Sequence, residues 1–429
     1  MAARTSAFSF KDRNENVSEI GRALNVSSIL EGSVRKFGDR LRITVQLVNA
    51  ADGYHLWSER YDRDMKDVFE VQDDISLAVV RALKVKLLGT EKAAVLKRHT
   101  ENAEAYELYL MARHYWQQVK VESIHKGIEL CEKAIELDPN YAEAYSGLAD
   151  CLVTLSWIGG ARPSDEFPKA RLAAEEAVRL DPSLGEAYVS LSYVHFLYDW
   201  QWEQSEREMR RAIELAPGYV MAYIRLVVMM TAFGRTDEAL AAAARTQELD
   251  PLAANSMLAM GYSLYFARRY EDAISEMRKA VEMHPHAYRL YIVLAWAHEA
   301  LGQTRDAVSA LERFRNVQNY SLVVSQLGYA LAKDGRRDEG LTIVAKLIEQ
   351  AKHEYVSALD IATVFLGLDD REQAFFWLER AFEERSGWLI ALNTMPRYDG
   401  VRSDPRFVDL VRRMGLDQAK EASQRLRKG

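Results

Sequence analysis

The stretch EKAIELDPNYAEAY at residues 132–145 decides the fold, because it recurs along the chain. It returns as EEAVRLDPSLGEAY at 175–188 and as RRAIELAPGYVMAY at 210–223, with weaker copies RTQELDP at 245–251 and KAVEMHP at 279–285. The prolines of these copies are spaced 43, 35, 34 and 34 residues apart; they are Pro139, Pro182, Pro217, Pro251 and Pro285. A period near 34 residues is typical of stacked helical hairpins.

A second set of markers keeps the same period. Each is a small residue at the start of an expected second helix, and the set is Gly127, Ala170, Ser205, Ala239, Ala273, Ala307, Gly340 and Ala374. A small side chain lets two helix backbones approach closely, and proline cannot continue a helix because it lacks the N–H. The two sets predict about eight helical hairpins over residues 100–386.

The fifth copy carries a resemblance to the tetratricopeptide repeat (TPR) family. Met260-Gly261 matches the Leu-Gly pair of the family's first helix, Tyr270 the aromatic residue before the second helix, Ala273 and Ala280 the small packing positions, and Pro285 the terminator. The resemblance implies a mostly α chain in which hairpins stack into an α-α superhelix. Residues 387–416 are expected to cap its end, with a helix starting at Ser403-Asp404-Pro405, and residues 417–429 form a polar tail.

Residues 1–95 have a different pattern and predict a small α+β domain. A short helix is expected at 16–25, then two strands within residues 27–53 joined through Gly38-Asp39, a third strand at 54–61, and a helix from about Asp67 to Leu88. The segments ARTS at 3–6, ILEGSVRK at 29–36 and FEVQDDIS at 69–76 resemble the TolB amino-terminal-like (FlgO-like) domain. Arg4, Thr5 and Ser6 are expected at a strand end.

The resemblance to the TolB amino-terminal-like domain implies an additional domain ahead of the ARTS segment and a sheet with an unpaired edge strand. Members of this group of bacterial proteins commonly carry, ahead of the ARTS segment, a further strand and helix and an effector such as a class III adenylate cyclase or a winged-helix domain. This chain starts at that segment. An unpaired sheet edge is usually covered or paired with another chain, so we expect a truncated reading frame or a homodimer through the N-terminal domain.

Composition and charge disfavour nucleic-acid-binding, disulfide-rich and membrane-spanning classes of protein. The net charge of the 429 residues is −7, divided as +3 over residues 1–99 and −10 over the rest, so a nucleic-acid surface is disfavoured. Two cysteines, Cys131 and Cys151, are too few for a disulfide framework and indicate a reducing compartment. No run approaches 18 apolar residues and the start lacks a secretory signal, so we expect a cytoplasmic protein without membrane insertion.

Signatures of catalysis are missing from the sequence. There is no G-x-x-x-x-G-K-[ST], G-x-G-x-x-G, G-x-S-x-G or H-E-x-x-H motif. The pairs His284/His286, Asp62/Asp64 and Asp73/Asp74 each offer too few ligands for a metal ion, and solvated side chains are the simpler interpretation. We expect no enzyme activity, no metal and no cofactor.

The expected site is a surface. In the family's geometry the first helix of each hairpin lines a concave groove, and carrying that register over gives Tyr193, Phe196, Tyr262, Tyr265, Phe266, Trp296 and Tyr329. These residues predict a groove that binds an apolar helix or peptide of another protein. The alternative for each ring is a place in the core. For the whole chain, the alternative to a non-catalytic interaction scaffold is the regulatory part of an adenylate cyclase or transcriptional regulator.

Overall fold

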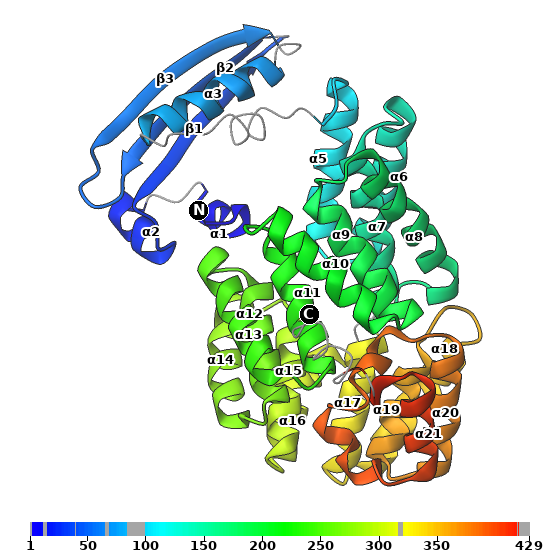
Figure 1. Cartoon of the computed structure of the whole chain (residues 1–429). Coiled ribbons are helices and arrows are strands. Elements are labelled where there is room, and N and C mark those ends of the chain that lie inside the picture. The colour runs from blue at the N-terminus through cyan, green and yellow to red at the C-terminus, as the bar shows by residue number, and fades with distance from the viewer. Residues whose placement is uncertain are drawn as a thin grey trace. The chain divides into compact units, whose positions relative to one another are not determined.

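The structure, a computed structural model, describes residues 2–11, 15–38, 40–64, 68–83, 99–315, 321–417 and 419. The chain forms two compact units, one of residues 1–107 with 248–252 and one of residues 108–247 with 253–429. Helices predominate, and the small antiparallel sheet lies in the first unit (Figure 1). This confirms the predicted fold class.

The first unit contains a sheet of three strands in the order β1-β2-β3, both neighbouring pairs antiparallel. They are β1 (Ser28–Phe37), β2 (Arg40–Asn49) and β3 (His55–Asp64), with α2 (Val17–Ala23) before them and α3 (Val68–Ala82) after them. The predicted turn at Gly38 has a φ of +59°, a conformation that glycine adopts without strain. Val45, Tyr61 and Val71 form the small core between the sheet and α3.

The amino-terminal segment differs from the prediction. Arg4–Phe8 is a short helix, α1, rather than a strand end. Its place within the first unit is set by polar contacts: the backbone N–H of Ser6 donates to Asp250 Oδ1 at 2.9 Å, and the N–H of Ala3 donates to the carbonyl of Leu249 at 2.7 Å. These N–H groups at the start of α1 have no partner within the helix, and the contacts with Asp250 and Leu249 satisfy them.

The second unit stacks helical hairpins, and eight pairs lie within the described residues. In chain order they are α5 (Ala103–Gln117) with α6 (Val121–Leu137), α7 (Ala142–Trp157) with α8 (Pro163–Leu180), α9 (Gly185–Val194) with α10 (Trp202–Leu215), α11 (Val220–Ala232) with α12 (Thr236–Leu249), α13 (Ala254–Phe266) with α14 (Tyr270–Met283), α15 (Tyr288–Ala300) with α16 (Thr304–Leu311), α17 (Ser321–Lys333) with α18 (Arg337–Gln350), and α19 (Ala358–Gly367) with α20 (Arg371–Glu383). A π-helix, η2 (His195–Asp199), extends α9, and a 3₁₀ turn, η3 (Glu312–Phe314), extends α16.

Both sets of sequence markers fall where the hairpins require them. Each of the five prolines lies two residues after the end of a second helix, and all eight small residues lie buried on second helices. The close approach is visible at Gly261 of α13, where an added Cβ would lie 2.4 Å from Met277 Cε on α14. The repeat pattern therefore follows from steric limits on helix packing.

The chain after α20 does not add another hairpin. Two 3₁₀ helices, η4 (Gly387–Ala391) and η5 (Pro396–Val401), lead to α21 (Pro405–Arg413). As predicted, Asp404 caps α21, its Oδ1 accepting from the N–H of Arg406 at 3.0 Å. Phe407, Leu410, Val411 and Met414 are buried, and α21 packs against α20.

Candidate functional site

The first helices of the repeats form one continuous layer, which we call the inner face. Neighbours along this layer contact one another, α7 with α9, α11 with α13, and onward through α15 and α17 to α19. All seven predicted groove residues belong to it or to its π-helical extension: Tyr193 on α9, Phe196 in η2, Tyr262, Tyr265 and Phe266 on α13, Trp296 on α15 and Tyr329 on α17. The register carried over from the repeat pattern therefore selects the right helices.

These seven rings are buried in the structure and do not lie open to solvent. None of the seven is more than 7% exposed, and Phe196 is fully buried. Phe196 packs edge-on against Trp202 and Phe233, with ring centroids 5.7 and 5.9 Å away, so it belongs to the core. Tyr265, on the helix face next to α15, is buried against Trp296 at 5.4 Å. Partner binding by these seven residues stays a proposal.

The chain's own carboxyl-terminal part covers the inner face. We call residues 386–402 the inner segment; it contains η4 and η5. η4 contacts α7, η2 and α11. The indole ring of its residue Trp388 stacks on that of Trp157 of α7, with a centroid distance of 4.3 Å. Trp388 also lies 6.0 Å from the ring of Tyr262 and 6.1 Å from that of Trp296. The segment thus places an aromatic side chain among the rings predicted to hold a ligand.

Close approach at the start of the inner segment depends on a glycine. An added Cβ at Gly387 would lie 3.2 Å from Cε3 of Trp157. The missing side chain lets the backbone pass over the indole of α7, and Trp388 then reaches the rings beside it.

Arg397 is the second anchor of the inner segment. Its side chain is 3% exposed and forms an ion pair with Glu299 of α15, Nη2 to Oε2 at 2.9 Å. Nη1 donates to Gln326 Oε1 at 2.7 Å, and the guanidinium lies 4.2 Å from the ring centroid of Tyr329. Burial raises the pKa of Glu299 to about 7, and the charge of Arg397 opposes that shift. A buried carboxylate here requires a cation.

Further polar contacts shape the inner segment. Arg402 donates to the backbone carbonyls of Leu392 at 3.1 Å, of Asn393 at 2.5 Å and of Met395 at 2.9 Å, so it holds the turn between η4 and η5. Arg268, after α13, donates two bonds to Asp399, of 2.7 and 3.0 Å. That last pair is solvent-exposed and contributes little to stability.

A second buried charge cluster lies near the other end of the inner face. Asp150 on α7 is 1% exposed and pairs with Arg113 of α5 at 3.0 Å and with Arg225 of α11 at 2.8 Å. Ser190 of α9 donates to the same carboxylate at 2.6 Å. Arg225 also lies 4.7 Å from the ring of Tyr193. One acid held by two guanidinium groups fixes the relative position of four repeats.

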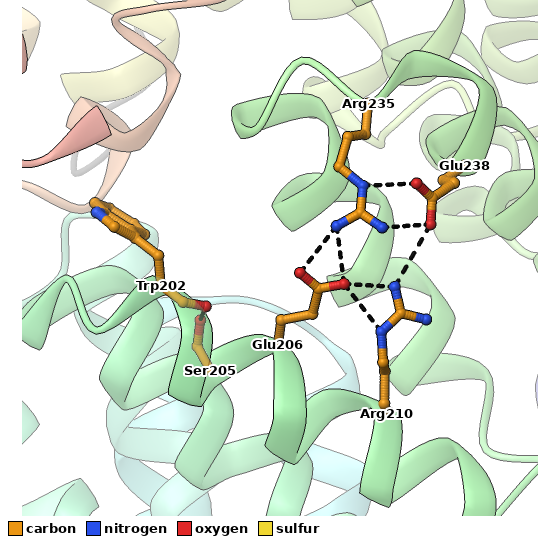
Figure 2. A network of polar contacts seen from close by, with 6 residues as sticks. All are labelled: Trp202, Ser205, Glu206, Arg210, Arg235 and Glu238. Carbon is orange, nitrogen blue, oxygen red and sulfur yellow. Dashed lines mark hydrogen bonds and ion pairs between the residues drawn. The ribbon is translucent and has the colours of Figure 1, made fainter. Parts of the chain in front are cut away.

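A third network joins α10 to the start of α12 (Figure 2). Glu206 of α10 is fully buried and accepts two bonds from Arg235 Nη1, at 2.8 and 2.9 Å, and one from Arg210 Nε at 2.9 Å. Arg235 in turn pairs with Glu238 at 2.6 Å. Two arginines and two glutamates balance in charge, and the network ties successive repeats together.

The sequence did not reveal these charged groups. Lys333, at the end of α17, pairs with Asp369 at 2.7 Å and lies 5.9 Å from the ring of Tyr329. The partners Glu299 and Arg397 are 98 residues apart, and no local spacing relates them. The available signal is an arginine or acid inside an otherwise apolar first helix, as at Arg225 in VMAYIRLVVMMTA.

Within the described ranges, no group of three or more His, Cys, Asp or Glu side chains could hold a metal ion. Asp62 pairs with Arg42 at 2.9 Å, and Cys131 and Cys151 are buried free thiols. No described helix has the length and apolar character needed to cross a bilayer.

Comparisons with known proteins agree with the repeat architecture. Residues 130–162 and 258–321 match models of the tetratricopeptide repeat. A solved human IFIT1 dimer with PPP-AAAA aligns with a TM-score of 0.51 at 14% identity, covering 79% of this chain and 80% of that one. PilW, a type IV pilus biogenesis factor, aligns with a TM-score of 0.41 at 15% identity, covering 54% of this chain and 99% of that one. The second unit is thus a solenoid of TPR type.

A curated relative supplies a different link. "Putative adenylate cyclase 3" of Rhizobium meliloti (strain 1021) is 34% identical over 175 residues, which is 40% of this chain. The match spans only 30% of that relative's length. The matches to the repeat models indicate a TPR-type protein-interaction scaffold, and TPR proteins bind other proteins or peptides.

Proposed function

We propose that the chain is a non-catalytic cytoplasmic scaffold that binds an apolar peptide or helix of another protein on its inner face. The observation that carries the proposal is the inner segment itself: the face already holds a peptide with two 3₁₀ helices through ring stacking at Trp388 and an ion pair at Arg397. A surface that binds a peptide of its own chain has the shape and chemistry to bind one from a partner. The two free thiols fit a reducing compartment.

The test is a selection of phage-displayed peptides on the full chain carrying Trp388→Ala, in parallel with the wild type. We expect the variant to enrich peptides that contain large aromatic residues, because the vacated place among Trp157, Tyr262 and Trp296 becomes accessible. Phe376→Ala is the matched control, since it removes a ring that is 53% exposed on α20. A folded Trp388→Ala chain that enriches no aromatic peptides would contradict the proposal.

A second candidate is the regulatory part of an adenylate cyclase or of a transcriptional regulator. What favours it is the 34% identity to the cyclase-named relative. In this hypothesis residues 1–95 form a TolB amino-terminal-like domain, residues 100–386 the repeats, residues 387–416 the cap and residues 417–429 a tail. Translation of the genomic DNA ahead of Met1 tests it: an in-frame strand preceded by a cyclase or winged-helix domain supports it, and a stop codon directly upstream contradicts it.

We also propose self-association through β1. Leu30, Val34 and Phe37 on this strand are 49%, 66% and 63% exposed, and β1 is an edge of the described sheet. Two copies of β1 paired antiparallel about Ser33 would place Glu31 opposite Arg35 twice, a favourable cross-strand charge pair. Light scattering should show a dimer that Arg35→Glu disrupts and that the double swap Glu31→Arg/Arg35→Glu restores. A monomeric wild type contradicts this proposal.

A further inference from the structure

The inner segment presents two side chains, nine positions apart, to two different environments. Trp388 of η4 enters the aromatic cluster of α7, α13 and α15, and Arg397 of η5 enters the polar site of α15 and α17. Trp296 contributes to both environments, since its ring lies 6.1 Å from Trp388 and its Nε1 donates to Gln326 Oε1 at 2.8 Å. The two anchor sites are therefore coupled through one side chain.

The aromatic site selects for ring shape rather than for a hydrogen bond. Nε1 of Trp388 is buried and has no hydrogen-bond partner in the part of the chain that the structure describes. Its affinity for the site comes from stacking on Trp157 and from apolar burial. Any large aromatic side chain satisfies this site.

The polar site selects for arginine. A planar guanidinium can face Tyr329, pair with Glu299 and donate to Gln326 at once, whereas an ammonium group cannot reproduce that fork. Glu299 Oε1 is itself buried without a hydrogen-bond partner among the described residues, so the acid has no substitute for the cation. An occupant without arginine would leave Glu299 buried and unpaired, which is costly.

The inner segment is joined at both ends to packed helices. It follows α20 and precedes α21, and α21 is tied back to α20 by ion pairs of Arg413 with Glu379 and of Arg406 with Glu372. A segment held at both ends competes with a free peptide at an effective concentration in the millimolar range. Its release as a loop would expose Leu389, Ile390 and Leu392, which are buried, but would leave the ion pairs between α20 and α21 in place.

We propose that the inner segment is an internal ligand, and that the partner replacing it is a protein segment with a large aromatic residue followed by an arginine about nine positions later, the arginine being recognised by Glu299. This inference rests on the proposed function, since it names the partner chemistry of the same face. It revises the expected ligand, which was apolar throughout, because the face contains one buried acid at a defined place.

The experiment uses the full chain and a fluorescent synthetic peptide with the sequence of residues 384–404. In fluorescence anisotropy, Trp388→Ala/Arg397→Ala should bind this peptide at least about 30-fold more tightly than the wild type does, because its own anchors no longer compete. A peptide with alanine at the Arg397 position should bind that variant about tenfold more weakly. Adding Glu299→Gln to the variant should abolish that difference between the two peptides. Phe376→Ala should bind as the wild type does.

The outcomes separate the two proposals. Binding to the variant that is equally tight for the arginine and alanine peptides would overturn the recognition by Glu299 and leave the proposed function standing. Equal binding to wild type and variant would overturn the internal-ligand role. No binding to a variant that still melts cooperatively would overturn both.

A measurement on the wild type covers the case in which the double variant does not fold. Native-state hydrogen exchange should show amides of residues 387–401 opening at least about tenfold more often than those of α13 and α15, because the loop opens without the repeats. Equal protection of the two sets would overturn the proposal, because the segment would then leave only on global unfolding.

Discussion

The inner face of the second unit and the β1 side of the first unit's sheet are both rich in apolar side chains, yet their exposure differs completely. The seven predicted groove rings are at most 7% exposed because the inner segment and neighbouring helices cover them. On β1, Val34 is 66% exposed although it pairs directly with Ile43 of β2. Residue type alone does not decide burial; what decides it is whether another element lies over that face.

The difference also concerns charge. On the inner face, the buried acids Asp150 and Glu299 are matched by arginines from distant parts of the sequence. On the sheet, charged side chains lie at the surface and pair across neighbouring strands, as Arg42 does with Asp62. Loss of an inner-face partner should therefore cost far more than loss of a sheet pair.

The largest effect is expected at a fully buried inner-face ring. Tyr265→Ala should lower the free energy of unfolding by about 4 kcal/mol, because it leaves a cavity beside Trp296 that the stacked helices cannot close. Urea denaturation of the purified chain measures this. Tyr54→Ala is the control, since Tyr54 is 75% exposed and its loss should change stability by less than about 0.5 kcal/mol. A small effect at Tyr265 would instead support the interpretation that this ring lines an open groove.

A slightly smaller effect is expected at the buried network of α10 and α12. Glu206→Gln should cost about 3 kcal/mol, because it leaves Arg235 buried with one charged partner fewer. Glu203→Gln, one turn earlier on α10, removes an exposed pair with Arg207 and should cost at most about 0.5 kcal/mol. Thermal denaturation of both variants measures the two losses. Equal melting temperatures would mean that a buried ion pair contributes no more to the stability of this chain than an exposed one does.

The architecture could be predicted from the sequence because its rules are local. The small residues, such as Ala273, and the prolines, such as Pro285, act within one hairpin, where backbone contact and the lost N–H leave few alternatives. The same holds for Asn16, whose side chain caps α2 by accepting from the N–H of Ser18 at 2.9 Å.

The site could be predicted only in part. The repeat register placed Tyr262 and Trp296 on the correct helices, but their covering depends on Trp388, more than 90 residues away. The stretch GWLIALNTMPRYDG shows no helical or strand period, so its place on the inner face had no local signature. Ion pairs such as that of Asp150 with Arg225 likewise depend on the superhelix.

A moderate effect is expected from pH. Burial raises the pKa of Asp360 on α19 to about 7, although bonds from Ser321 and Ser325 oppose the shift. The folded state then binds a proton that the unfolded state has released, so stability should fall by about 2 kcal/mol as pH rises from 5 to 7. Urea denaturation at several pH values should show a shallower slope for Asp360→Asn, which cannot ionise.

The control for this pH dependence is Asp369→Asn, because that side chain is 81% exposed. It should keep the wild-type slope. If Asp360→Asn also keeps the wild-type slope, the buried acid does not couple folding to pH. Buried acids of the inner face would then differ less from the exposed acids of the sheet than the burial of Asp360 indicates. Above pH 7 the Asp360→Asn chain should be more stable than the wild type, since the cost of ionising a buried group disappears.

The smallest effect is expected on the uncovered side of the sheet. Val34→Lys should change the free energy of unfolding by less than about 0.5 kcal/mol, because the side chain at this edge position is already in water. Val45→Ala, on β2 beneath α3, should cost about 2 kcal/mol, because Val45 packs against Tyr61 and Val71. Denaturation followed by circular dichroism measures both. Edge-to-edge pairing of two β1 strands leaves this face of the sheet open, so a large loss at Val34 would mean that a second copy of the chain lies over the face instead. A concentration-dependent melting temperature lost in Val34→Lys would identify that cover.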